Sequence, residues 1–454
     1  MLIHRIQLAH PSRWLCGAAW LLAAVWAAVF PLITAPEPHR VWGLCAAPGY
    51  LCAAVAVLSS PRRGRAVPVW CAAVGAVVVP FALLVLTGCA QSEVEVMERA
   101  GLLTLHQGTP YRADPRSVVE VTPYLPGMAV FGVPRAALGE DGLLLRVLGD
   151  ARLWCAAAFF GCLWVARRGT GVQETAERKA RNTYALGAFV ASPVVAFPLC
   201  VSGVDLPLTG LLVLVLVYAA RRRPVAAGLA LAAVCSLKWT AWPAVAVAVA
   251  LLAQRGGFRA AVRCAAVAVG GTAPLVLPGA LLSPGPLVRQ VFAFPTGRGP
   301  WETPAASPLP GRLLADLGTA GWYAAAGLLL CAGAAVAVSL VVRPPRALVP
   351  AADRLALGLS LAFLLAPAGR FGYLAVPVTL VVIARLVGGA DRTRPVRDLD
   401  VRIRGRHVPS QPRSDAAHHT QGRPSLRPAG PPGADGRARP EPCGCPPPGP
   451  DRAS

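Results

Sequence analysis

Two glutamates, Glu93 and Glu95, stand where a carboxylate could take part in acid–base chemistry. The stretch from residue 91 to residue 108 has the spacing of an amphipathic helix, and both glutamates fall in its first turn. The helix dipole favours the ionised form of a carboxylate there. An ionised carboxylate can accept a proton from a hydroxyl group as a general base. We therefore predict Glu93 as the catalytic base, with Glu95 as its alternate.

The same residues also have a purely structural interpretation. Ser92 followed three positions later by Glu95 matches a capping box, and Glu95 could pair with Arg99 one turn further on. Gly108 is expected to end the helix. In this interpretation Glu95 caps the helix, Glu93 complements its dipole, and neither does chemistry.

Cationic side chains in apolar surroundings are candidates for binding an anionic group. Lys238 lies within an apolar stretch, and an ionisable residue there is a functional candidate. Its alternative role is to extend its ammonium group to the membrane interface beside neighbouring tryptophans. Arg370 occupies a tight turn before Phe371, and Arg289 follows an apolar run. We predict Lys238, Arg370 and Arg289 as binding residues, since a cation can stabilise developing negative charge.

Other polar residues have both structural and binding interpretations. Asp205 precedes Pro207 at an expected helix start, where it could cap the helix or contribute to substrate binding. Tyr111 and Tyr124 could stack on a sugar or mark the membrane interface. His106 is expected to complement the dipole at a helix end.

The composition of the chain determines which elements must position these residues. Of the 454 residues 55% are hydrophobic and 15% are charged, and the mean hydropathy is +0.53. These values exclude an ordinary soluble enzyme, a fibrous protein and a disordered chain. Uncharged runs such as residues 67–89 exceed the roughly 20 residues that cross a bilayer. We predict an all-α, polytopic protein of the cell membrane with about 12 transmembrane helices.

Three regions follow from the order of apolar runs and basic clusters. Residues 1–66 form a basic start with two transmembrane helices, and residues 67–387 form a membrane core with long outer loops at about 90–152 and 283–318. Within the core, two short helices should meet at residues 238–243, and residues 121–138 form a broken segment at the interface. Residues 388–454, rich in Arg, Pro and Gly, form a disordered cytoplasmic tail.

The net charge of +22 does not indicate a nucleic-acid partner, because the arginines cluster between apolar runs as the positive-inside rule requires. The cysteines are scattered singly through apolar stretches, where cysteine behaves as a small hydrophobic residue. Cys443 and Cys445 form a pair without further ligands at metal spacing. We assign no disulfide framework, metal site or cofactor.

A set of short motifs resembles the polytopic, polyprenyl-phosphate-dependent glycosyltransferases of the GT-C class, and glycosyltransferase family 87 (DUF2029) in particular. The resemblance covers roughly residues 67–386. It rests on Ser92-Glu-Val-Glu-Val-Met97, Leu102-Leu103, Gly108-Thr-Pro-Tyr111, Thr122-Pro-Tyr-Leu-Pro126, Ser202-Gly-Val-Asp-Leu206 and the apolar run from Gly228 to Pro243.

The resemblance implies an outward-facing transferase that uses a polyprenyl-phosphate sugar as donor. With that donor, it implies that Lys238, Arg370 and Arg289 bind the donor phosphate. The family includes α-1,2-mannosyltransferases, so mannose is the sugar it implies by default. This sequence departs from the family pattern, which usually has Asp where Glu93 stands and Tyr where Met97 stands. Two additional transmembrane helices also precede the core.

We accordingly expect an inverting hexosyltransferase that acts on an extracytoplasmic acceptor hydroxyl. Its partners are the lipid bilayer, the lipid-linked sugar donor and a glycolipid or glycan acceptor. Two alternatives are a multi-span transporter or lipid flippase, and a catalytically inactive relative of the transferases. Against transport stands the sequence's lack of an internal repeat of the kind found in many secondary transporters.

Overall fold

The computed structural model describes residues 13–59, 66–169 and 175–388. The chain divides into two units after Arg394, and every described residue belongs to the first. The basic start at residues 1–12, the tail predicted to be disordered from residue 389, and the Cys443/Cys445 pair lie outside the described residues.

The described residues form helices, as the apolar runs predict, with one isolated β-bridge between Ala306 and Gly369. The longer helices are α1 (Arg13–Ile33), α2 (Glu37–Ser59), α8 (Ala151–Gly169), α9 (Ala176–Val190), α11 (Asp205–Ala220), α12 (Pro224–Leu237), α13 (Pro243–Gly256), α14 (Phe258–Leu282), α17 (Thr319–Val342), α18 (Leu348–Leu365) and α19 (Ala375–Gly388). A further long helix is continuous through α3 (Ala66–Ala73), the π-helical segment η2 (Val74–Val78) and α4 (Val79–Thr87).

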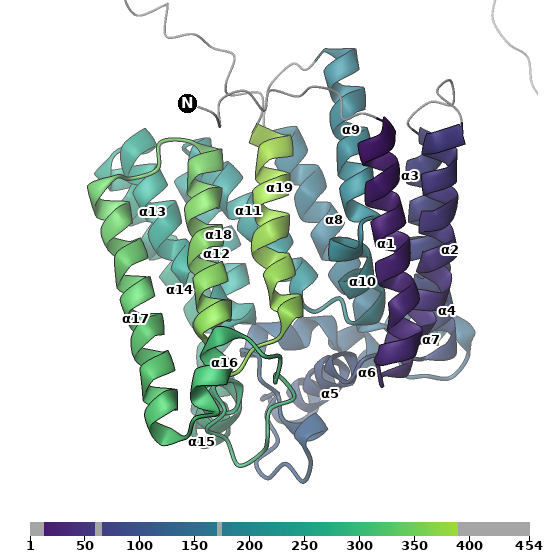
Figure 1. Cartoon of the computed structure of the whole chain (residues 1–454). Helices are drawn as coiled ribbons and strands as arrows, with labels where there is room; N and C mark the ends of the chain where they lie inside the picture. Colours follow the sequence, from purple (N-terminus) through teal and green to yellow (C-terminus); the bar gives the residue numbers. More distant parts are fainter. Residues whose placement is uncertain (1–12, 60–65, 170–174, 389–454) are drawn as a thin grey trace, which may run out of the picture. The chain divides into compact units, whose positions relative to one another are not determined.

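The remaining elements lie between these helices. They are α5 (Ser92–Gln107), η3 (Val118–Glu120), η4 (Pro126–Phe131), α6 (Val133–Leu138), α7 (Leu143–Gly149), α10 (Pro193–Val201), η5 (Trp239–Ala241), α15 (Pro284–Leu287), η6 (Val288–Ala293), η7 (Phe294–Thr296), α16 (Pro310–Ala315) and η8 (Phe371–Leu374). In Figure 1, α5, α6, α7, α15 and α16 lie at the lower end of the long helices. The two stretches expected to be outer loops thus contain short helices.

Many long helices present large apolar side chains on a face that no other described residue covers. Leu22, Leu32 and Val341, for example, are exposed. Such faces suit contact with lipid acyl chains, since hydrocarbon accepts apolar side chains and requires every backbone polar group to be satisfied within the helix. The chain is therefore a membrane protein of several apolar helices.

The predicted count of about 12 spans is not confirmed. Among the described residues, seven helices are long and apolar enough to cross a membrane, or eight if α9 and α10 form one bent span. Helices α11 and α12 are apolar but have 16 and 14 residues. They are shorter than the roughly 20 residues that a straight helix needs to span a bilayer. Some of the apolar runs that the sequence analysis counted as spans therefore form helices below this length.

Several helix boundaries that were predicted from local sequence signals are present in the structure. Gly108 adopts a left-handed conformation (φ 73°) directly after α5, as expected for a glycine that ends a helix. The apolar run from residue 225 breaks at Lys238, where α12 ends, and resumes as α13 at Pro243. The segment at residues 121–138 is broken into η4 and α6, as its prolines predict.

The predicted capping of α5 is wrong. The residue before the helix is Gln91, Ser92 is already helical, and the N-cap residue makes no side-chain capping bond. Arg99 does not pair with Glu95 and instead donates to the carbonyl oxygen of Val119. The competing partner lies in the loop that follows α5, which the helix pattern alone does not reveal.

A large apolar core runs through α2, α8 and α10–α14 and reaches α18 and α19. A smaller cluster joins α5 to η4 and α8 through residues such as Val94, Met97 and Met128. This second cluster buries one face of α5 and leaves its first turn partly open. The packing therefore holds Glu93 at the edge of the helical core.

Candidate functional site

Glu93 and Arg370 form an ion pair although 277 positions separate them in the chain. Arg370 Nη1 donates to Glu93 Oε1 at 2.6 Å, and the two side chains retain 24% and 22% exposure. Arg370 lies in extended backbone just before η8, and its Nε donates to the carbonyl of Pro304 at 3.3 Å. Within the described residues, Glu93 Oε2 makes no hydrogen bond, so one carboxylate oxygen is anchored and the other is available.

Lys238 and Asp205 form a second ion pair. Lys238 Nζ lies 2.5 Å from Asp205 Oδ1, and it also lies 4.8 Å from the centre of the Tyr124 ring, within cation–π range. Lys238 reaches this position because the backbone becomes extended between α12 and η5. Asp205 is the first residue of α11 and its side chain makes no capping bond, so the predicted N-cap role is wrong and the carboxylate instead pairs with Lys238.

The two ion pairs lie within electrostatic reach of each other. Burial raises the pKa of Glu93 above its ordinary value, while the positive charges of Arg370 and Lys238 lower it and the negative charge of Asp205 raises it. Burial also raises the pKa of the Tyr124 hydroxyl, and the charge of Glu93 adds to this effect. We call Glu93, Arg370, Lys238, Asp205 and Tyr124 the charged cluster.

Tyr111 contributes to the cluster through Tyr124. Its ring is 1% exposed, and its hydroxyl donates to the backbone carbonyl of Tyr124 at 2.9 Å. Tyr111 is thus covered in this structure and supports the Tyr124 backbone, so stacking of its ring on a sugar is not available to it. Tyr124 is 5% exposed and has the Lys238 ammonium group against its ring.

Two predicted site residues are not joined to the charged cluster. Glu95 is exposed on α5, two positions beyond Glu93. Arg289 Nη2 donates to the carbonyl of Ala113 at 3.3 Å. In the described ranges, neither side chain makes a hydrogen bond or ion pair with a member of the cluster.

Residues that the sequence analysis did not single out fix the position of α5. Glu98 Oε1 accepts from the backbone N–H of Ala151 at 3.1 Å, and Glu98 Oε2 accepts from Arg135 Nε at 3.2 Å. The backbone N–H of Gln91 donates to the carbonyl of Val201 at 3.3 Å. Helix α5 is therefore attached to the first residue of α8 and to the last residue of α10.

Arg152 is the most constrained of these unpredicted residues. Its side chain is fully buried and pairs with Asp150, with Nη2 to Oδ2 at 2.7 Å. It also donates to the carbonyls of Leu84, Cys89 and Cys200. A signal was present in the sequence, because an arginine at the start of an apolar run must find buried partners.

The cluster combines a proton acceptor with cations, which are components of a group transfer with an anionic leaving group. Glu93 presents a half-buried carboxylate oxygen that can accept a proton, and Lys238 presents an ammonium group that can stabilise negative charge. Among the described residues, no group of three or more His, Cys, Asp or Glu side chains could hold a metal ion.

Comparison with known proteins gives one match. The model of glycosyltransferase family 87 matches residues 122–367, which is more than half of the chain. The matched range contains Tyr124, Asp205, Lys238 and Arg289, whereas Glu93 precedes it, as do Glu95 and Tyr111, and Arg370 follows it. No curated protein and no solved structure matches the chain.

Proposed function

Because the chain belongs to glycosyltransferase family 87, we propose that it transfers a hexose from a polyprenyl-phosphate sugar to an acceptor hydroxyl at the charged cluster. Its membership makes it a glycosyltransferase, and its apolar helices embed it in the lipid bilayer. The donor, the sugar and the acceptor are parts of the proposal. The observation that carries it is the approach of the Glu93–Arg370 and Lys238–Asp205 pairs.

In the proposed reaction the acceptor oxygen attacks the anomeric carbon of the sugar. The bond from that carbon to the phosphate oxygen breaks, its electron pair leaves with the polyprenyl phosphate, and Glu93 Oε2 takes the hydroxyl proton. Direct attack from the side opposite the leaving group inverts the anomeric centre. The hydrogen bond to Oε1 fixes the orientation of the carboxylate. A general base is effective when it is held in the correct orientation toward the proton that it accepts.

Lys238 and Arg370 bind the phosphate in this proposal. Lys238 has three N–H donors and only one is used by Asp205. Arg370 Nη2 makes no hydrogen bond within the described residues, while Nη1 and Nε are occupied by Glu93 and Pro304. Both cations can therefore add a phosphate contact while keeping their present partners.

The remaining assignments follow the resemblance. We propose mannose as the sugar, a glycolipid or glycan as the acceptor, and a cell-membrane location in which the charged cluster faces outward and the C-terminal tail is cytoplasmic. Arg289, Tyr111 and Asp205 act around the site by holding the adjacent loops and the Lys238 side chain.

A substitution of Glu93 tests the proposal directly. In the purified full-length protein, Glu93→Gln should lower the rate of transfer from a synthetic mannosyl-phosphoryl polyprenol by about 100-fold or more, since the amide cannot accept the proton. The amide keeps the shape of the side chain, so the thermal unfolding temperature should remain close to that of the wild type. Glu95→Gln, two positions along the same helix, is the matched comparison and should retain activity.

Three results would contradict the assignment. Loss of activity in Glu95→Gln alone would make Glu95 the base. Full activity in both variants would remove the first turn of α5 from the chemistry. A wild-type protein that moves no sugar but catalyses solute counterflow would be a transporter.

A further inference from the structure

A cavity lies between α8, α9 and α19, away from the charged cluster. Its volume is about 830 Å³, which is within the range of ligand-binding pockets. Its lining includes Arg167 and Arg168 in the last turn of α8, whereas the first residue of α8, Ala151, contacts Glu98 of α5. Since a helix rises about 1.5 Å per residue, roughly 20 Å of helix separates the two ends.

The cavity exists because α9 diverges from its neighbours. The chain bends by 56° between α9 and α10, at Pro193. Helix α9 has no buried residue among those described, whereas α10 buries Val195, Ala196 and Leu199 in the core. The bend thus leaves a space between α8 and α19 that α9 covers only in part.

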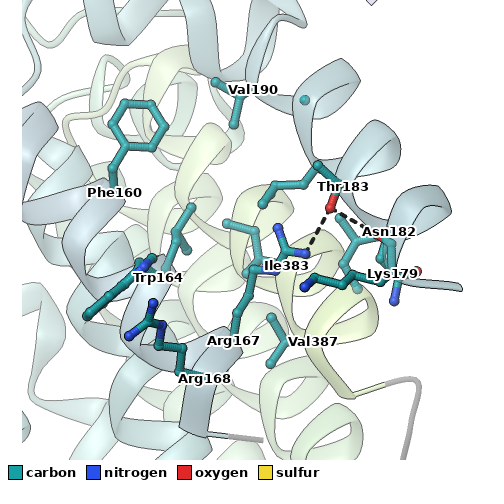
Figure 2. Close-up of a pocket in the computed structure, with 14 residues that line it drawn as sticks. Phe160, Trp164, Arg167, Arg168, Lys179, Asn182, Thr183, Val190, Ile383 and Val387 are labelled. Carbon is teal, nitrogen blue, oxygen red and sulfur yellow. Dashed lines mark hydrogen bonds between the residues drawn. The ribbon is translucent and has the colours of Figure 1, made fainter. Parts of the chain in front are cut away.

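The walls of the cavity divide into an apolar part and a cationic rim, as Figure 2 shows. The apolar part includes Phe160, Trp164, Leu186, Val190 and Ile383. It extends along α8 from Phe160 to Arg167, which corresponds to about 10 Å of helix. An apolar wall of that length can accommodate part of one lipid acyl chain.

Three cations form the rim, namely Arg167, Arg168 and Lys179, and no carboxylate is among the described residues that line the cavity. Arg167 Nη2 donates to Thr183 Oγ1 at 3.0 Å, which directs its guanidinium group across the opening toward α9. The Arg168 guanidinium group lies 3.9 Å from the centre of the Trp164 ring. Lys179 is exposed on the facing side of the opening.

We propose that this cavity binds an anionic phospholipid of the bilayer. The phosphate group lies at the rim formed by Arg167, Arg168 and Lys179, and one acyl chain lies along the apolar wall. Charge complementarity selects an anionic head group, because each Lys or Arg near the surface favours such lipids. The apolar wall selects a molecule with a chain over a soluble phosphate. This site is distinct from the proposed site of sugar transfer, so an experiment can contradict one proposal without contradicting the other.

The test is a binding measurement on the purified full-length protein in neutral detergent. Native mass spectrometry with added dioleoylphosphatidylglycerol should show that the protein retains one lipid molecule. The affinity for dioleoylphosphatidylcholine should be lower by about tenfold or more. The double variant Arg168→Gln/Lys179→Gln should weaken binding of the anionic lipid about tenfold or more. Arg259→Gln/Arg263→Gln removes two exposed arginines of α14 outside the cavity and should leave binding unchanged.

A second variant probes the apolar wall. Leu186→Trp adds bulk to the cavity and should weaken lipid binding while the rim cations remain. Equal loss in the α14 variant would show a non-specific charge effect and overturn the proposal. Equal binding of both lipids, or competition by glycerol 3-phosphate at the same concentration as the lipid, would also overturn it. Tighter binding of farnesyl phosphate would assign the cavity to the polyprenyl carrier instead.

Discussion

The hydrogen bond from Arg370 to Glu93 has two opposing consequences for the proposed base. The hydrogen bond orients the carboxylate through Oε1. The positive charge of Arg370 lowers the pKa of Glu93, whereas burial raises this pKa and is the larger effect. An ion pair at the base does not by itself prevent proton transfer, because the second oxygen is available and burial favours the protonated form. The balance between the two effects should determine the acidic limit of activity.

This balance gives a prediction for Arg370→Gln. The base is active only when deprotonated, so activity is lost as the pH falls through the pKa of Glu93. Removing the positive charge removes an influence that lowers this pKa, which is already raised by burial. The acidic limb of kcat/KM should therefore move to higher pH.

The control for this measurement is Arg312→Gln. Arg312 lies in α16 and pairs with Asp316, which directly follows that helix. The pH profile of this variant should coincide with that of the wild type. An unchanged acidic limb in Arg370→Gln would show that Glu93 is not the titrating base.

At the scale of elements, the position of Glu93 depends on how closely α5 packs against the η4–α6 segment. A Cβ atom added to Gly101 would lie 2.2 Å from the carbonyl carbon of Gly132, and one added to Gly132 would lie 2.0 Å from the carbonyl oxygen of Met97. Two glycines thus allow the two backbones to touch. Because the obstacle is backbone, a larger residue must displace α5.

We predict that Gly101→Ala lowers stability by about 1–3 kcal/mol and reduces sugar transfer, since overpacking forces the backbone apart. The unfolding temperature and the transfer rate of the purified variant measure the two effects. Gly161→Ala on α8 is the matched control, because a Cβ there meets nothing within 4 Å. Alanine should be neutral or slightly stabilising at that helical position. Wild-type behaviour of Gly101→Ala would show that α5 tolerates displacement.

At the scale of the whole molecule, the two proposed binding regions require opposite sides of the membrane. Helix α14 has 25 residues, and at about 1.5 Å per residue it exceeds the roughly 30 Å of the hydrocarbon core. Arg263 lies in its first turns and Arg289 follows its last turn. If α14 spans the bilayer, these two positions face different compartments.

Labelling with a membrane-impermeant thiol reagent measures this. The 13 native cysteines must first be replaced, because otherwise they would react too. In intact cells, a cysteine in place of Arg289 should be labelled from outside and one in place of Arg263 should not. Both should react once the membrane is permeabilised. Labelling of both positions from outside would contradict a spanning α14. Labelling from outside at position 263 but not at position 289 would contradict the outward location of the charged cluster.

Much of the helical framework could be predicted from the sequence, because the signals for it are local. Long apolar runs require helices in a membrane, Gly108 ends α5, and the residues around Pro243 interrupt a run that is too long for one helix. These effects act within a few residues of the position that causes them. The number of spans was not predictable in the same way, since α11 and α12 are apolar yet short.

The partners of the residues in the charged cluster were decided by the tertiary structure alone. Asp205 had the local pattern of a helix cap but pairs with Lys238, 33 positions away. Glu93 meets Arg370 only because packing brings the start of α5 to the turn before η8. The sequence by itself determined which residues carry charge and where helices begin and break. Which charges meet depends on the summed packing of distant apolar faces, and no short segment of the chain contains that information.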